Sequence, residues 1–143
     1  MTTHEHPHTI YSDKAPEPVG PYPHARRVGN LLFLSGVGPR QRGSRAIPGV
    51  TLDAAGHVID HDIEAQCHAV FENVRAILEA AGSHWERIVD VTVFLTDMKR
   101  DFPTFNRIYG EYFKVNPPAR TTVEVSALPT PIAVELKVIA TVD

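Results

Sequence analysis

Two charged residues near the end of the chain, Arg120 and Glu135, could together bind a carboxylate and activate a water molecule. Arginine binds a carboxylate through two parallel, charge-assisted hydrogen bonds, and a nearby glutamate can hold a water for attack. The alternative is an ion pair without a catalytic role, between Arg120 and either Glu135 or Glu124. The spacing of these residues alone does not decide between a ligand site and an ion pair.

Both residues lie in segments that alternate as β-strands do. In residues 120–126 the valines occupy one face and Arg120 occupies the other. In residues 132–142 the even-numbered positions are apolar and share a face that we expect to lie under helices, so Glu135 points to the opposite side. If the two strands are neighbours, Arg120 and Glu135 project from the same side of the sheet.

Two other segments have the period of amphipathic helices. Apolar residues recur every three or four positions through residues 62–81, and a glycine follows as a stop signal. Residues 101–113 form the second helix, with Asp101 as the expected N-cap. Cys67 lies on the apolar stripe of the first helix, where packing is a more natural role than nucleophilic chemistry. The prolines at 117–118 are expected to end the second helix and to fix the start of the next strand.

Further strands are expected at residues 30–35 and 88–96, with a short one at 57–60 inside a long loop. The strands at 30–35 and 88–96 are apolar on both faces. A sheet with two apolar faces and only two helices must bury one face elsewhere, so we expect the chain to self-associate.

The bulk composition suits one domain at residues 10–143, preceded by a flexible N-terminal arm at residues 1–9. With 14 Lys and Arg against 17 Asp and Glu, and no basic run, nucleic-acid binding is not expected. No apolar stretch approaches the roughly 18 residues that span a bilayer. A single cysteine and no signal peptide suit a cytoplasmic protein. The arm carries three histidines with no carboxylate or cysteine partner at typical ligand spacing, so a metal is not expected. No cofactor is expected either, because binding a carboxylate and activating a water need none.

Five short motifs, taken in order, resemble those of the Rid/YjgF imine-deaminase family. They are VGPY (19–22), LSG (34–36), FPTFNRIY (102–109), PPARTTVEV (117–125) and VELKVIA (134–140). The resemblance implies an α+β, chorismate-mutase-like fold, in which two helices pack on one face of a mixed β-sheet. It also implies a homotrimer with a central β-barrel and with active sites between subunits.

The resemblance further implies roles for individual residues. Arg120 is similar to the family arginine that binds the substrate carboxylate, and Glu135 is similar to the acid that positions the hydrolytic water. Thr122 stands where the typical family member has a cysteine. Together with Thr122, the remaining substrate-binding positions are Tyr22, Ser35, Gly36 and Asn106.

The long segment at 38–62 and the threonine at 122 resemble the 2-aminomuconate deaminase branch of the family. That branch acts in bacterial breakdown of 2-aminophenol-type and tryptophan-derived aromatic compounds. Its substrate is a dicarboxylate enamine, which is converted to 4-oxalocrotonate and ammonia. A second carboxylate needs a second cation, although each candidate taken singly is expected to be a solvated surface charge. The candidates are Arg26, Arg27, Arg40, Arg42 and Arg45.

Two alternatives remain at the level of sequence. The first is a broad 2-iminoacid deaminase, and the second is a non-catalytic trimer that binds carboxylates. Retention of Arg120 together with Glu135 favours catalysis, because binding alone needs only the arginine.

Overall fold

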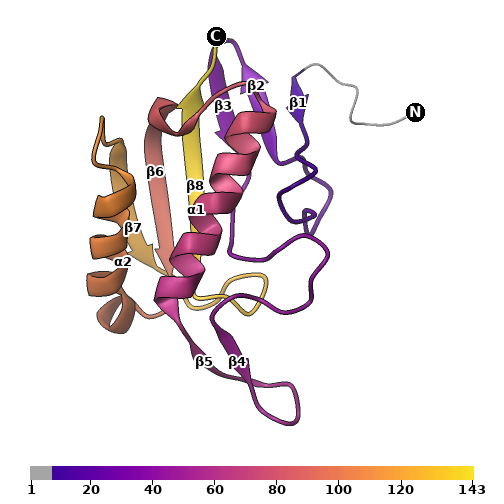
Figure 1. Ribbon diagram of the computed structural model, residues 1–143, viewed down its shortest axis with the longest axis vertical. Helices are drawn as coiled ribbons and strands as arrows, with labels where there is room; N and C mark the ends of the chain where they lie inside the picture. Colours follow the sequence, from indigo (N-terminus) through magenta and orange to yellow (C-terminus); the bar gives the residue numbers. More distant parts are fainter. Residues whose placement is uncertain (1–7) are drawn as a thin grey trace.

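Two helices packed on one face of a mixed six-stranded β-sheet form the body of the molecule (Figure 1). The computed structural model describes residues 8–143, so His4 and His6 of the expected arm lie outside the described residues. Within the described part, no helix is long and apolar enough to cross a membrane. Across the sheet the strands follow in the order β1 (Thr9–Ile10), β2 (Ala25–Val28), β3 (Leu31–Leu34), β8 (Val134–Thr141), β6 (Ile88–Leu95) and β7 (Ala119–Glu124).

Both helices begin after an aspartate that caps the first turn. α1 (Ile63–Ala80) follows Asp62, whose carboxylate accepts hydrogen bonds from two backbone N–H groups, so its predicted start is confirmed. α2 (Met98–Tyr112) begins one turn earlier than predicted, because Asp97 caps it by accepting from the backbone N–H three residues on. The prediction of Asp101 as the N-cap was wrong, since this side chain is buried within the first turn.

α2 ends before the two prolines and not at them. Its C-cap, Phe113, leaves the helical conformation at φ −114° and ψ 45°, and its ring stacks on Trp85 with centroids 4.7 Å apart. Asn116 then adopts a left-handed φ of 54° in the connecting turn. β7 begins at Ala119, directly after the second proline. The prolines therefore precede the start of the strand as predicted, but they do not end the helix.

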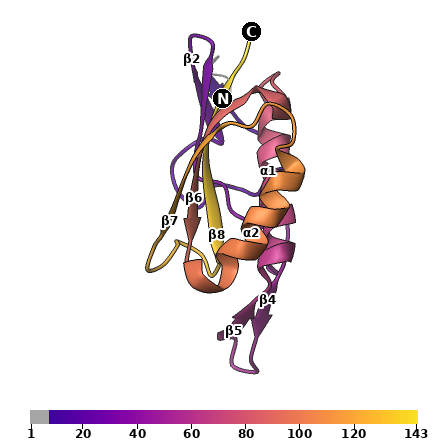
Figure 2. The same cartoon turned by 90° about the vertical axis from the view of Figure 1, so that its left-hand side faces the viewer.

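β8 lies in the interior of the sheet and alternates as predicted. Its even-numbered side chains are fully buried, whereas Glu135 and the other odd-numbered side chains are half-buried on the opposite side. Seen edge-on, both helices lie on one side of the sheet, and no helix among residues 8–143 covers the other side (Figure 2). This open face also carries Phe33 and Phe94, so it is partly apolar.

β7 lies at the edge of the sheet, parallel to β6, and is not a neighbour of β8. Arg120 pairs with Val91, which is fully buried on the helix side, so Arg120 also projects to the helix side. Glu135 pairs with Phe94 and projects to the open face. The prediction that Arg120 and Glu135 share a face assumed neighbouring strands, and it was wrong.

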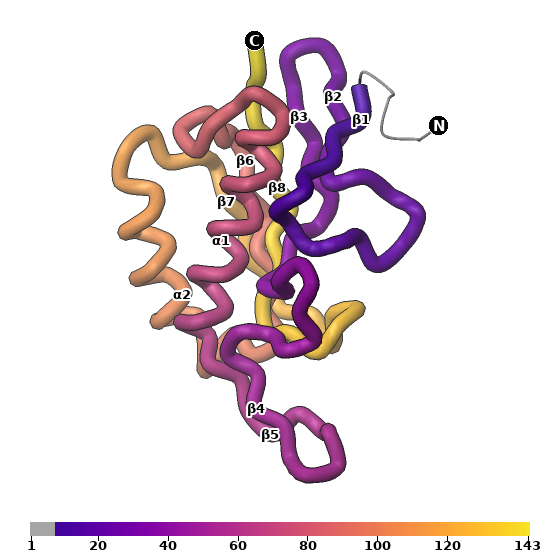
Figure 3. The backbone as a smooth tube through the Cα atoms, turned by 45° about the vertical axis from the view of Figure 1, so that its right-hand side comes forward, coloured from indigo at the N-terminus to yellow at the C-terminus, as the bar shows by residue number. Residues whose placement is uncertain are grey.

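The expected strands at 30–35 and 88–96 are confirmed as β3 and β6, but three other short strands were not predicted. β1 and β2 extend the sheet beyond β3. β4 (Val50–Leu52) pairs with β5 (Val58–His61) in a hairpin that projects beyond the end of the sheet (Figure 3). The strand expected at 57–60 is thus β5, while β4 lies in the segment expected to be a loop. Strands this short depend on their partners and show little alternation of their own.

Phe71, in the middle of α1, holds the two helices together. Its side chain is fully buried. Aromatic rings surround it with centroids 4.5 to 6.3 Å from its own. These contacts fix α2 against α1 and thereby fix the residues of α2 that face β7. The surrounding rings are Trp85, Phe105, Tyr109, Tyr112 and Phe113.

Replacing Phe71 with alanine should lower the free energy of unfolding by about 3–5 kcal/mol, because it removes a buried ring and leaves a cavity. Urea unfolding at one fixed protein concentration measures the loss. Val115→Ala is the matched control: this side chain is 72% exposed, so its truncation should change the stability by less than about 0.5 kcal/mol. Equal stability of the two variants would contradict a central role for Phe71.

Candidate active site

Four of the predicted site residues, which we call the Glu135 group, gather beside the end of β3. The group consists of Tyr22, Ser35, Gly36 and Glu135. A cavity of about 110 Å³ is lined by Tyr22, Gly36 and Glu135, together with Arg40. An adjoining cavity shares Tyr22 and Gly36 and adds Ser35. The structure thus brings together residues from three separate parts of the sequence.

A two-way backbone bridge places Gly36 against Glu135. The N–H of Val37 donates to the carbonyl of Leu136 at 2.8 Å, and the N–H of Leu136 donates to the carbonyl of Val37 at 2.9 Å. A Cβ atom on Gly36 would lie only 2.5 Å from Oε2 of Glu135. Position 36 therefore lets the carboxylate approach the backbone only because it has no side chain.

Ser35 supports the cavity wall through its own hydrogen bonds. Its Oγ donates to the carbonyl of Pro23 at 2.7 Å, and its N–H donates to the carbonyl of His24 at 2.9 Å. These bonds fix the loop that carries Tyr22, whose hydroxyl accepts a hydrogen bond from the backbone of Val19 at 3.3 Å. In the single chain Ser35 therefore positions the loop next to the cavity.

Glu135 is a titratable residue of this cavity whose pKa is shifted. Burial raises the pKa of its carboxyl above the ordinary glutamate value. No hydrogen bond or ion pair engages its carboxylate within residues 8–143. A carboxylate with a raised pKa and unoccupied lone pairs has the properties of a general base that holds a water.

The other predicted residues, which we call the Arg120 group, lie between β7 and α2. The group consists of Asn106, Arg120 and Thr122. The guanidinium carbon of Arg120 is 4.6 Å from the ring centroid of Tyr109 and 5.8 Å from that of Phe102. Asn106 follows Phe102 by one helical turn and precedes Tyr109 by another, so it lies on the same stripe of α2. Two aromatic faces thus hold the arginine beside an exposed amide.

Two buried hydroxyls near Arg120 have no hydrogen-bond partner within the described residues. They belong to Thr122 and Tyr109. Burial raises the pKa of the Tyr109 hydroxyl to about 12, so this group stays protonated. A buried hydroxyl without a partner costs free energy, and such groups are frequent where a water or a ligand completes the site.

The two groups do not meet within one chain. Glu135 of β8 pairs with Phe94 of β6, and Phe94 pairs in turn with Val123 of β7. Arg120 also lies on β7, two strands away from Glu135 and three residues before Val123. These spacings put the two Cα atoms about 14 Å apart, on opposite faces of the sheet. Neither of the ion pairs considered for Arg120 is formed in the described chain, and Glu124 instead accepts a hydrogen bond from the backbone of Met98. One group contains Glu135 and the other contains Arg120.

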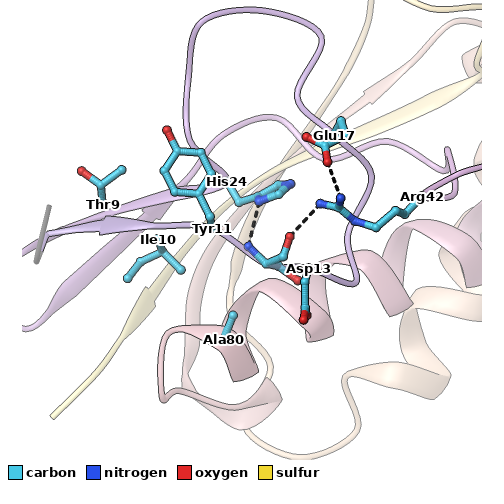
Figure 4. A pocket seen from close by; sticks show the side chains of 9 residues that line it. Thr9, Ile10, Tyr11, Asp13, Glu17, His24, Arg42 and Ala80 are labelled. Carbon is cyan, nitrogen blue, oxygen red and sulfur yellow. Dashed lines mark hydrogen bonds and ion pairs between the residues drawn. The ribbon is translucent and has the colours of Figure 1, made fainter. Parts of the chain in front are cut away.

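Of the five arginines considered for a second carboxylate, Arg40 alone lines the Glu135 cavity. Arg42 forms an ion pair with Glu17 and donates to the carbonyls of Ser12 and Ala15. It lines a separate cavity of about 400 Å³ next to His24 (Figure 4), which contains no predicted site residue. Arg42 is therefore a structural clamp.

Cys67 lies in the hydrophobic core and belongs to neither group. Cys67 is fully buried, as its place on the helix predicted, and burial raises the pKa of its thiol to about 12. Within residues 8–143, no three His, Cys, Asp or Glu side chains are grouped as metal ligands. The described chain thus presents the Glu135 and Arg120 groups as its candidate site.

The sequence comparisons match nearly the whole chain. The family model described as Endoribonuclease L-PSP matches residues 12–142. A RutC family protein of Pyrococcus abyssi is 40% identical over 131 residues, covering 92% of this chain and 94% of the relative. Reactive Intermediate Deaminase A of Arabidopsis thaliana, a chloroplastic protein, is 37% identical over 92% of this chain and 64% of its own length.

Solved structures agree with the sequence matches. The YjgF gene product of E. coli superimposes with a TM-score of 0.79 at 34% identity, covering 93% of this chain and 97% of the other. E. coli TdcF, solved with bound serine, gives a TM-score of 0.80 at 32% identity, covering 94% and 98%. Because the fold, the ordered motifs and these matches extend over almost the full length, the chain belongs to the Rid/YjgF family.

Proposed function

We propose that this protein is a hydrolytic imine and enamine deaminase whose substrate is 2-aminomuconate, which it converts to 4-oxalocrotonate and ammonia in the cytoplasm. The observation that carries the proposal is Glu135, a carboxyl of raised pKa without a protein partner in the described chain, beside Gly36 in a cavity. Membership of a family that includes a protein named Reactive Intermediate Deaminase A supports the reaction class.

The reaction needs no redox step. Arg120 binds one substrate carboxylate, and the enamine tautomerises to the imine. Glu135 holds a water and accepts its proton as the oxygen attacks the imine carbon. The resulting carbinolamine collapses, the C–N bond breaks, and the proton held by Glu135 passes to the leaving nitrogen. Backbone groups near Gly36 and Thr122 steady the amino group. The balance is imine plus water giving a ketone and ammonia.

In this proposal the site is completed by a second copy of the chain. The open face of the sheet is partly apolar, and the Arg120 group lies at the edge strand β7. A head-to-tail trimer can set the Arg120 group of one copy against the Glu135 group of the next, and it closes into a ring. The open-face side chains that such an assembly would bury include Leu31, Phe33, Phe94, Val123 and Ile139.

Two alternative functions differ from the proposed one in what they predict for substrate turnover. A broad 2-iminoacid deaminase is favoured by the name of the Arabidopsis relative, and it predicts comparable turnover of small imino acids and 2-aminomuconate. A non-catalytic carboxylate-binding trimer would bind 2-oxoacids without turnover, and it has no use for the raised pKa of Glu135. The net charge of −3 favours a small-molecule substrate over RNA.

Arg120→Ala and Glu135→Gln should each lower kcat/KM for 2-aminomuconate at least about 100-fold, since one loses the carboxylate contact and the other loses the base. Ammonia release, followed together with the absorbance of the substrate, measures the effect. Arg107→Ala is the control, because this arginine is exposed on α2 and only forms surface ion pairs. Near-normal turnover by both site variants that still assemble would refute the mechanism.

Mixing the two inactive variants should restore activity if the two groups come from different copies. In randomly assembled 1:1 mixed trimers, about a quarter of the sites would receive intact Arg120 from one copy and intact Glu135 from the next. Co-refolding of Arg120→Ala with Glu135→Gln, followed by the ammonia assay, tests this. If both residues acted from the same copy, every mixture would stay inactive.

The pH profile of kcat/KM should have an acid limb above pH 4.5, the ordinary pKa of a glutamate. Burial raises the pKa of Glu135, so on acidification the carboxylate takes up a proton sooner and no longer accepts one from water. Initial rates across an acidic pH series measure this limb, and the residual activity of Glu135→Gln should lack it. A limb at or below pH 4.5 in the wild-type protein would contradict the assignment.

A further inference from the structure

We infer that Arg40 binds a second anionic group of the substrate, remote from the reacting carbon, and makes the site selective for dicarboxylates. The inference rests on the proposed function, because it concerns the same cavity. Arg40 lines the Glu135 cavity together with Tyr22, Gly36 and Glu135. It also lines the adjoining cavity that contains Ser35. A cation is thus present at the cavity in addition to Arg120, which belongs to the other group.

The guanidinium of Arg40 has donors to spare. Its one hydrogen bond within residues 8–143 runs from an Nη2 donor to the backbone carbonyl of Glu17, at 2.7 Å. No described carboxylate forms an ion pair with it, although a guanidinium carries five N–H donors. Arg42, only two residues along the same loop, is bound by the Glu17 carboxylate and by two backbone carbonyls. The loop therefore holds one structural arginine and one whose charge is unmatched.

The backbone at Arg40 is anchored, which distinguishes it from a casual surface charge. Asn73 projects from α1, is only 9% exposed, and donates from Nδ2 to the carbonyl of Gly38 at 2.9 Å and to that of Arg40 at 2.7 Å. Pro39, between the two carbonyls, is buried. A buried amide on a rigid helix thus fixes the position from which the arginine reaches the cavity.

The chemistry of the cavity fits a chain with a charge at each end. Glu135 would act at the imine carbon, Arg120 of the neighbouring copy would bind the adjacent carboxylate, and Arg40 would bind the distal one. Val19 and Ile132 also line the cavity and can contact the carbon chain between the charges. A substrate that ends in a methyl group would leave Arg40 without its anion, so charge-assisted bonds of this kind predict a selectivity of about 10- to 100-fold.

A matched pair of substrates tests the inference. An amino-acid oxidase can generate the imines of 2-aminoadipate and norleucine in situ; both have six carbons, and only the first has a distal carboxylate. The wild-type protein should prefer the dicarboxylate, and Arg40→Ala should reduce the ratio of the two kcat/KM values about 10- to 100-fold. Arg45→Ala, an exposed arginine of the same loop, should leave the ratio unchanged. An unchanged ratio in Arg40→Ala would overturn the inference.

Binding without turnover separates this inference from the proposed function. Calorimetry with 2-oxoadipate and 2-oxohexanoate should show tighter binding of the dicarboxylate, and Arg40→Ala should remove that preference. If neither imine is hydrolysed but this pattern holds, the deaminase proposal fails and the role of Arg40 stands. If both imines are hydrolysed but the wild-type protein binds the two 2-oxoacids equally, the deaminase proposal stands and the role of Arg40 is refuted.

Discussion

The alternation of side chains in the central strands is the constraint on which the rest of the structure depends. β8 and β6 are paired over most of their lengths, and both bury one row of side chains beneath α1 and α2. A shift of one residue would exchange the two faces and expose the core. The same register that buries Leu136 therefore sends Glu135 to the open face, where its carboxylate meets the backbone of Gly36.

The position of Glu135 has a free-energy cost. Burial without a protein partner disfavours its ionised form, and the raised pKa reports that penalty. The backbone bridge between Val37 and Leu136 keeps Gly36 and Glu135 in contact despite it. The free energy that holds Glu135 in place thus comes from the backbone ladder and the core, and its carboxylate has no protein partner within the described residues.

Periodic segments were predictable because each has one buried side. α1, β3, β6 and β8 were found at their expected places. The apolar stripe of α1 also correctly predicted that Cys67 lies in the core. The start of α2 was mistaken because Asp97 and Asp101 are both suitable caps, and only packing decides which one is buried. β1 and β4 escaped prediction because strands of two or three residues are defined by their partners. β2 escaped prediction because two adjacent arginines occupy its centre and leave little apolar pattern.

The sequence by itself determined the family and the residue types of the candidate site, since the residue types and the order of the motifs are local properties. It also determined which face of β8 carries Glu135, because alternation within one strand depends only on that strand. The tertiary structure alone decided the face of Arg120. Its direction relative to Glu135 depends on which strands are neighbours and in what register, and those relations are set by long-range pairing that no single segment encodes.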